Sequence, residues 1–414
     1  MIEMQRQQQV SAERSMFRAL YNRNYRLLWI GLIISSTGAW MQTVAQGWLV
    51  FNLTGRATDI GMIALMRAIP LVSFSLFGGA MADFMERRKL LYITQSIQGS
   101  LAMVLGILVY TGRVQVYHVY IVAMCTAAAL AFDQPARQSL IPRLVKKDEL
   151  MNALVLNSIA YQGSGMLGPT LTGLLVPYIG IGGCYVANAL SYGAVLIALY
   201  LIDMPPGVAA KRTSSLWRDL TRSFYEMRED TRILALVLTS LFVSFFGRGY
   251  NQYMPVYADL VLHVGVRELG FLMSGSGVGT VLASLIVAKM GNISRKGRLI
   301  VCANVFFSLS LIGFAWSSSF LFSFLLLTLV GGLFTLSQAM TNTSVQLIAR
   351  DEVRGRITSL FTLTGLAAMP LGQVPLGALI EQIGPSPALS LFALTVGLGT
   401  IVVALIIRPF WRMD

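Results

Sequence analysis

The chain consists of long apolar runs separated by short polar stretches. A helix needs about 20 apolar residues to cross the hydrocarbon core of a bilayer, and twelve runs come close to that length or exceed it. They lie at 27–51, 60–82, 91–110, 116–134, 150–176, 181–202, 233–256, 269–290, 299–316, 320–342, 356–380 and 386–408. The pattern therefore predicts an all-α integral membrane protein with twelve transmembrane helices.

The second half of the chain repeats the first. Residues 144–150 (LVKKDEL) match residues 347–353 (LIARDEV) at an offset of 203 residues, close to half of the 414-residue length. A repeat of this kind is typical of transporters built from two bundles. We expect five parts: a cytoplasmic N-terminal tail (1–26), a six-helix bundle (27–202), a cytoplasmic amphipathic linker (203–232), a second six-helix bundle (233–408) and a cytoplasmic C-terminal tail (409–414).

The composition agrees with a membrane protein, since 55% of the residues are hydrophobic and only 12% are charged. A net charge of +13 would also suit a nucleic-acid-binding protein. The positions of the Lys and Arg residues decide between these two classes of protein. Of the 32 Lys and Arg residues, 27 fall on the side of the predicted spans that carries both termini. Because cytoplasmic loops are enriched in Lys and Arg, we expect both termini in the cytoplasm, a lipid bilayer as the environment and no nucleic-acid partner.

The residues that usually carry enzymatic or metal chemistry are few and scattered. Cys125, Cys184 and Cys302 lie inside apolar runs, at spacings unlike those of a metal site or a disulfide framework. His118 and His263 are far apart in sequence, so neither a catalytic triad nor a metal cluster can be assembled. We therefore expect no enzymatic activity, no bound metal and no cofactor.

A loop motif follows the second apolar run, at residues 79–89 (GAMADFMERRK). It resembles the signature loop of the major facilitator superfamily, Gly-x-x-x-Asp-Arg-x-Gly-Arg-Arg. Phe84 and Glu86 replace the first arginine and the second glycine of that pattern. The resemblance implies the major facilitator fold, in which two pseudo-symmetric six-helix bundles rock about a central site.

Other stretches narrow the resemblance to a bacterial branch that exports drugs and siderophores and includes the enterobactin exporters. They are residues 40–50 (WMQTVAQGWLV) and 132–142 (FDQPARQSLIP), together with the segments 354–356 and 370–372. The glycines between 163 and 173 loosely resemble the antiporter signature of exporters, although close helix packing explains them equally simply. The resemblance implies a secondary transporter in a bacterial inner membrane, with protons as the coupling ion.

The resemblance also implies a gating latch between the bundles. Gly79 would allow close helix approach, Asp83 would lie at the positive end of another helix, and Asp133 would pair with Arg87. Asp133 is also a candidate proton carrier, because a carboxylate inside a span is costly unless it has a function. The residues assigned to the latch are Gly79, Asp83, Arg87, Arg88, Asp133, Arg137 and Arg354.

Two arginines, Arg67 and Arg248, lie inside predicted spans of different halves, at similar depth from the outer side. Each either faces a central cavity or binds backbone carbonyls and reaches outward. Two cations in a cavity would favour an anionic substrate. Polar residues on neighbouring spans are further substrate-binding candidates or, alternatively, contacts between helices: Gln42, Gln46, Asn157, Tyr161, Asn251, Gln252, Gln338 and Asn342.

We therefore predict a proton-coupled exporter of small organic molecules, drugs or siderophores, that works as a monomer by alternating access. Uptake of an anionic metabolite is the second transport hypothesis. A membrane sensor or scaffold that transports nothing is the alternative of a different class.

Overall fold

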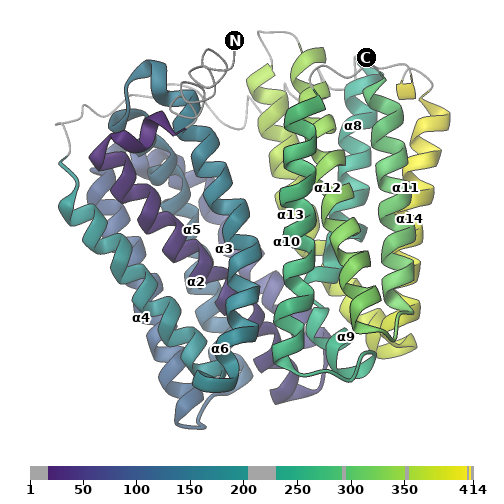
Figure 1. Cartoon of the computed structure of the whole chain (residues 1–414), viewed down its shortest axis with the longest axis horizontal. Coiled ribbons are helices and arrows are strands. Elements are labelled where there is room, and N and C mark those ends of the chain that lie inside the picture. Colours follow the sequence, from purple (N-terminus) through teal and green to yellow (C-terminus); the bar gives the residue numbers. More distant parts are fainter. Residues whose placement is uncertain (1–16, 204–229, 291–294, 350–353, 408–409, 412–414) are drawn as a thin grey trace, which may run out of the picture.

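The computed structural model describes residues 17–203, 230–290, 295–349, 354–407 and 410–411 (Figure 1). Side chains within these ranges are described except at 75–84, 290, 354–356, 359–360 and 362–367. Most of the predicted linker and of both predicted tails therefore lies outside the described residues.

The described residues form helices joined by short loops, with no β-strand among them, which confirms the predicted all-α class. The N-terminal half contains η1 (Arg18–Tyr21), α2 (Arg23–Thr54), α3 (Ala57–Phe84), α4 (Arg87–Tyr110), α5 (Val116–Leu144), η2 (Lys147–Glu149) and α6 (Leu150–Leu201). The C-terminal half contains α8 (Thr231–Phe242), η3 (Val243–Gly247), η4 (Arg248–Asn251), α9 (Met254–Leu260), α10 (Val266–Met290), α11 (Lys296–Ala315), α12 (Phe320–Ile348), α13 (Arg354–Ile383) and α14 (Pro385–Ile406).

Ten segments of the described chain are long and apolar enough to cross a membrane. One of them, Lys147–Leu201, holds two spans, because the backbone of α6 breaks at Gly180 with φ 66° and ψ 179°. That region of backbone conformation is open to glycine and to almost no other residue. With α13, which has the length of a span, the described residues contain the twelve membrane helices that the sequence predicts.

Local sequence sets the ends of the first long helix. The side chain of Asn22 accepts hydrogen bonds from the backbone N–H groups of Asn24 and Tyr25, at 3.0 and 3.4 Å. These amides belong to the first turn and have no acceptor within the helix. Gly55, with φ 65°, ends α2 in the left-handed conformation. The following turn sends α3 back across the bundle.

The seventh predicted span, 233–256, is not one continuous helix, and this corrects the sequence analysis. α8 passes into the π-helical turn η3, then into the 3-10 turn η4, before α9 begins. Arg248 is the first residue of η4, and Gly247 and Gly249 flank it. Turns of π type interrupt the regular hydrogen-bond ladder and are frequent at functional sites.

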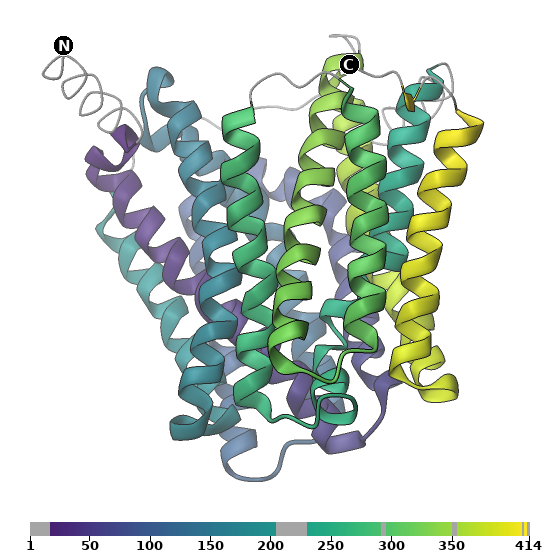
Figure 2. The same cartoon turned by 45° about the vertical axis from the view of Figure 1, so that its right-hand side comes forward.

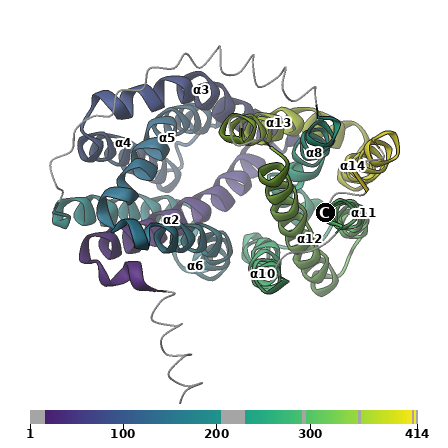
Figure 3. The same ribbon diagram turned by 90° about the horizontal axis from the view of Figure 1, so that it is seen from above.

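The two halves form bundles that stand side by side (Figures 1 and 3). Viewed from above, α2–α6 lie on one side and α8–α14 on the other, with α6 beside α10 and α3 beside α13. The described ends of the chain, Phe17 and Trp411, lie at one end of the molecule, which we call the termini face. The loops after α2, α4 and α9 lie at the other end, the opposite face.

Among the described side chains, one buried cluster connects the halves, and it lies at the opposite face. At the opposite face a single hydrophobic core takes residues from both halves. Toward the termini face the core divides: one cluster contains only residues between Ala19 and Ile202, the other only residues between Ile233 and Phe410. The described cores of the two halves therefore join at the opposite face and are separate toward the termini face, where the ribbons in Figure 1 also diverge. Figure 2 shows the same bundles from a second side.

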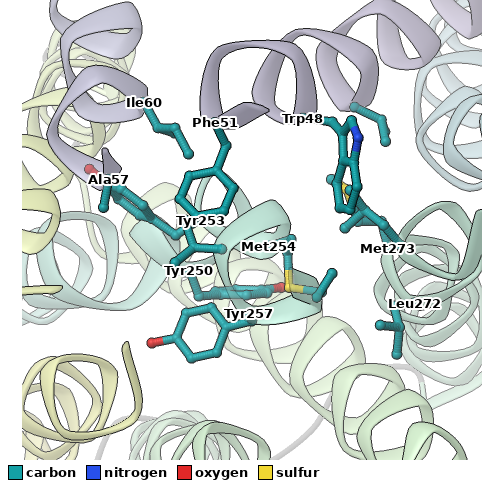
Figure 4. Close-up of a cluster of buried hydrophobic side chains, with 14 of the residues drawn as sticks. Trp48, Phe51, Ala57, Ile60, Tyr250, Tyr253, Met254, Tyr257, Leu272 and Met273 are labelled. Atoms are coloured by element: carbon teal, nitrogen blue, oxygen red, sulfur yellow. The ribbon is translucent and has the colours of Figure 1, made fainter. Parts of the chain in front are cut away.

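Figure 4 shows the part of the shared core that closes the opposite face. Phe51 of α2 and Ile60 of α3 point toward Tyr253 of the other half, Trp48 of α2 points toward Met273, and Met254 lies between them; all of these side chains are buried. This apolar packing leaves little room for water between the bundles. We call this group, together with Tyr250, Tyr257, Leu272 and Met273 around it, the seal.

Glycines allow the backbones of α6 and α10 to touch beside the seal. A Cβ added at Gly270 would lie 2.5 Å from the backbone nitrogen of Gly173, and one at Gly277 would lie 2.7 Å from the Cα of Met166. Gly173 belongs to the stretch that loosely resembles an antiporter signature. Its position supports the packing interpretation of that stretch, with the packing made between the two bundles.

Candidate functional site

The predicted cations Arg67 and Arg248 share one electrostatic neighbour. Tyr161 of α6 lies within electrostatic range of both guanidinium groups. Arg67 is ten residues into α3, so it lies about 15 Å along that helix from the opposite face. Both cations therefore lie within electrostatic range of Tyr161, on the termini side of the seal.

Arg248 has an aromatic neighbour and no acidic one. Its guanidinium carbon lies 4.7 Å from the centre of the ring of Phe334, a residue of α12. Among the described residues it has no hydrogen bond or ion pair, and its side chain is half-buried. A ring face attracts a cation without neutralising it. The charge of Arg248 therefore remains available to an anion.

Arg67 is half-buried as well and lies among hydroxyl groups. Tyr161 and Tyr192 are its electrostatic neighbours, and no described residue gives it a hydrogen bond or an ion pair. Asp133, the carboxylate inside a predicted span, is bound elsewhere. The region between the halves thus holds two positive charges without a described counter-ion. Burying an uncompensated charge is costly, which makes such a pair a candidate for ligand binding.

The other predicted substrate-binding residues divide by environment. Gln42 accepts a hydrogen bond from the amide of Asn188 inside the N-terminal half, which supports the helix-contact interpretation for this residue. Gln46 is buried, and its Nε2 has no partner among the described residues, which is unusual for a buried amide. Asn342 is exposed and accepts from Gln346 at 3.2 Å.

Four further candidates lie beside the cations in sequence or on the facing helices. Asn157 is half-buried one turn from Tyr161 on α6, and Tyr161 itself is 51% exposed. Asn251 and Gln252 are half-buried, just after Arg248 at the break in the seventh span, and Gln338 is half-buried on α12. Whether these residues bind a substrate remains a prediction.

Asp133 sits in a dense polar network inside the N-terminal half. Its carboxylate accepts hydrogen bonds from Thr94 Oγ1 at 2.9 Å, from Gln95 Nε2 at 2.6 Å and from two nitrogens of Arg137 at 3.0 and 3.3 Å. Arg87, the partner expected from the family resemblance, is not among these donors. These four hydrogen bonds satisfy the buried carboxylate and fix it within the N-terminal half. This favours a structural role over proton carriage.

The network continues toward Arg67. Gln98 donates to the backbone oxygen of Thr94 at 3.3 Å and accepts from the hydroxyl of Tyr192 at 3.3 Å. Tyr192 is in turn an electrostatic neighbour of Arg67. A chain of polar contacts therefore joins the cation of the N-terminal half to Asp133 near the termini face.

The other predicted latch residues are only partly described. Arg88 donates to the backbone oxygen of Tyr200 at 3.0 Å and lies 5.8 Å from the ring centre of Tyr92, so it joins helices within one half. The surroundings of Gly79 and the side chains of Asp83 and Arg354 are not among the parts that the structure describes. The latch between the halves at this face thus remains a prediction from the sequence.

Several residues of this region escaped the sequence analysis. Thr94, Gln95 and Gln98 stand on one stretch of α4, and such a group of polar residues inside an apolar run is a usable signal. Phe334 gives no signal of its own, because an aromatic residue in a membrane helix usually packs against lipid or neighbours. Its role depends on the tertiary fold.

Comparison with known proteins gives a consistent result. A family model described as transmembrane secretion effector matches residues 14–413. The staphyloferrin A transporter of Staphylococcus aureus is 22% identical and the match covers 84% of this chain and 85% of that protein. Macrolide efflux protein A of Streptococcus pyogenes is 22% identical, with 86% and 89% covered. The enterobactin exporter EntS of Shigella boydii is 20% identical, with 93% of both chains covered.

Solved structures share the fold. A bacterial homologue of the human lysosomal transporter spinster, in an inward-facing and unoccupied conformation, superposes with a TM-score of 0.67 at 15% identity. The match covers 94% of this chain and 96% of that one. At 15% identity, this similarity supports the fold and carries no statement about function.

Proposed function

The chain belongs to the transmembrane secretion effector family, a group of major facilitator transporters, and from this premise we propose that it exports small organic molecules with acidic groups in exchange for protons. It is a multi-pass membrane transporter and not an enzyme. We propose the bacterial plasma membrane as its location and the monomer as its working unit, because one chain supplies both bundles, at 27–202 and 233–408.

One observation carries the proposal: a core shared by both halves at the opposite face, and two separate cores toward the termini face. Two bundles joined at one face alone have the geometry of alternating access, in which the bundles rock about a midplane site. The positive-inside rule assigns the termini face to the cytoplasm. With this orientation we propose an inward-open state, in which the substrate site is accessible from the cytoplasm.

The two arginines support an anionic substrate. Arg67 and Arg248 come from different halves, and an anion bound between them would be held by both bundles at once. Such a ligand would reduce the repulsion between the two cations when the halves approach each other. Carboxylate or catecholate siderophores carry suitable groups, and the staphyloferrin A and enterobactin transporters are among the relatives.

Proton coupling rests on the family resemblance, and no single carrier is assigned. Asp133, the candidate carrier, accepts four hydrogen bonds inside the N-terminal half, and this supports a structural role for it instead. Exchange for protons would still use the inward proton gradient of a bacterial membrane to drive export. The coupling must therefore be tested by transport.

The test is transport into inside-out vesicles that contain the purified protein. Staphyloferrin A, enterobactin and erythromycin serve as probes, with and without an imposed pH gradient that is acidic inside. We expect a probe with acidic groups to accumulate in the acidic lumen and to leave when the gradient is removed. A matched vesicle with an Arg67→Gln, Arg248→Gln double variant controls for passive entry.

The outcomes separate the hypotheses. Accumulation of an anionic metabolite only in right-side-out vesicles would favour uptake over export. Accumulation of erythromycin alone would support export but contradict the proposal of an acidic substrate. Absence of flux for every probe in both vesicle orientations would contradict the export proposal.

A further inference from the structure

A carboxylate of one half binds the first turn of a helix in the other half at the opposite face. Glu381, near the end of α13, accepts hydrogen bonds from the backbone N–H and the hydroxyl of Thr58, at 2.9 and 2.7 Å. Arg56, in the turn before α3, has its Nε 3.8 Å from the same carboxylate oxygen. All three donors belong to the N-terminal half.

Thr58 is the second residue of α3, so its amide has no acceptor within the helix. Glu381 supplies that acceptor from the other bundle and adds a negative charge at the positive end of the helix. The ion pair with Arg56 is exposed and long, and contributes little by itself. The two bonds from Thr58 therefore define the contact.

The surrounding backbone brings the two groups together. Gly61, one turn after Thr58, faces the backbone of Gln373 and Val374 on α13, and Gly377 faces the oxygen of Ala57. α3 and α13 thus touch through small residues beside the seal. When the halves separate at this face, Glu381 and Thr58 must part, because they lie on opposite sides of the boundary.

We propose that Glu381 and the first turn of α3 form an outer latch, which holds the opposite face closed and is broken in each transport cycle. α3 would then carry a contact of this kind at both ends, since the motif with Asp83 includes its other end. The outer latch favours the state seen here, and the loop motif favours the alternative. The inference rests on the proposed alternation between two faces, and not on the identity of the substrate.

The experiment measures labelling of single cysteines by a membrane-impermeant maleimide in purified protein without substrate. Cys125, Cys184 and Cys302 are first replaced by serine or alanine. Leu272→Cys reports on the opposite face, because Leu272 is fully buried in the seal, and Asn157→Cys reports on the termini face. In this background we compare Glu381→Gln and Thr58→Val with the parent protein.

We expect both variants to speed labelling at position 272 relative to position 157. The ratio of the two rates should change about 5- to 10-fold, the lower part of the range for coupling between sites. The double variant should change the ratio no more than the larger single change, because both substitutions remove one contact. Asp259→Asn is the matched control: it removes an exposed carboxylate of the same half near the same face and should leave the ratio unchanged.

Yield and thermal unfolding temperature of each variant identify any folding defect, and Thr58→Val tests the latch without touching Glu381. An unchanged ratio in both folded single variants would overturn the latch. An equal change in Asp259→Asn would also overturn it, by making the effect one of net charge. If position 272 is never labelled in the parent protein under any condition, alternation itself fails and the latch with it.

Discussion

The two halves each hold a cation near their boundary but surround it differently. In the N-terminal half Arg67 lies beside Tyr192, at the end of a polar network that reaches Asp133. In the C-terminal half Arg248 lies over the ring of Phe334, at a break between helix types. The first cation lies near a structural network, and the second lies over an aromatic ring.

This difference predicts different roles for the surroundings of the two cations. A network of buried hydrogen bonds fixes the helices of the N-terminal half relative to one another. The interrupted helix of the C-terminal half leaves Arg248 with fewer constraints, because η3 and η4 do not follow the regular ladder. Substitutions in the network should therefore lower stability, and substitutions around Arg248 should lower affinity.

The largest effect should come from the network. Asp133→Ala leaves Arg137 without its partner in a buried site, which typically costs about 3–5 kcal/mol. We expect a clearly lower thermal unfolding temperature for the purified variant. Arg137→Ala should lower the unfolding temperature by a similar amount. The double variant should lose less than the sum of the two single losses. Wild-type stability in Asp133→Ala would show that the network is not structural.

Arg248→Gln should have the next largest effect, on affinity. Losing a charge-assisted hydrogen bond costs about 1.5–3 kcal/mol, which weakens substrate binding about 10- to 150-fold. Lysine should restore only part of the affinity, because it lacks the planar fork of arginine. The measurement is the apparent dissociation constant of the transported probe, together with the unfolding temperature. Lower stability with intact affinity would remove Arg248 from the site.

Phe334→Leu should weaken binding less than Arg248→Gln does. The contact between a cation and a ring is worth about 0.5–2 kcal/mol, or roughly 2- to 30-fold in affinity. Because the ring acts by placing Arg248, the same substitution should change nothing in an Arg248→Gln background. An equal loss of affinity in that background would indicate a direct contact between Phe334 and the substrate.

The smallest effect is expected at the loop motif. Asp83→Asn removes one charge near a helix end, where such interactions contribute about 0.3–1 kcal/mol when exposed. We expect labelling at position 272 to slow relative to position 157, the reverse of the change expected for Glu381→Gln. Folding and membrane insertion should stay intact. Unchanged labelling at both positions would leave the motif without a latch role.

The sequence predicted the twelve spans well, because the hydrophobic length of a membrane helix is a strong constraint. It also predicted the boundary near Gly180 between the fifth and sixth spans. It missed the break at Arg248, although the flanking glycines Gly247 and Gly249 are a local signal for one. Propensity arguments alone do not distinguish a packing glycine from one at a break.

The candidate site was predicted less completely. Arg67, Tyr161 and Arg248 could be named because ionisable and polar groups are rare inside spans. The contact between Thr58 and Glu381 joins residues 323 positions apart and depends on how two bundles dock. Tertiary placement, and not residue type, decides this pairing. The pair of Asp133 with Arg137 is different, because an i,i+4 spacing on one helix is visible in the sequence.

The most direct test of alternating access is a reversible cross-link at the opposite face. Thr58→Cys and Glu381→Cys, in the protein without its native cysteines, can be joined by a short bifunctional thiosulfonate and released with a reductant. We predict that the cross-linked protein still binds the probe but stops transporting it, and that reduction restores transport. Undiminished transport by the fully cross-linked protein would contradict the account, because the opposite face could not have opened.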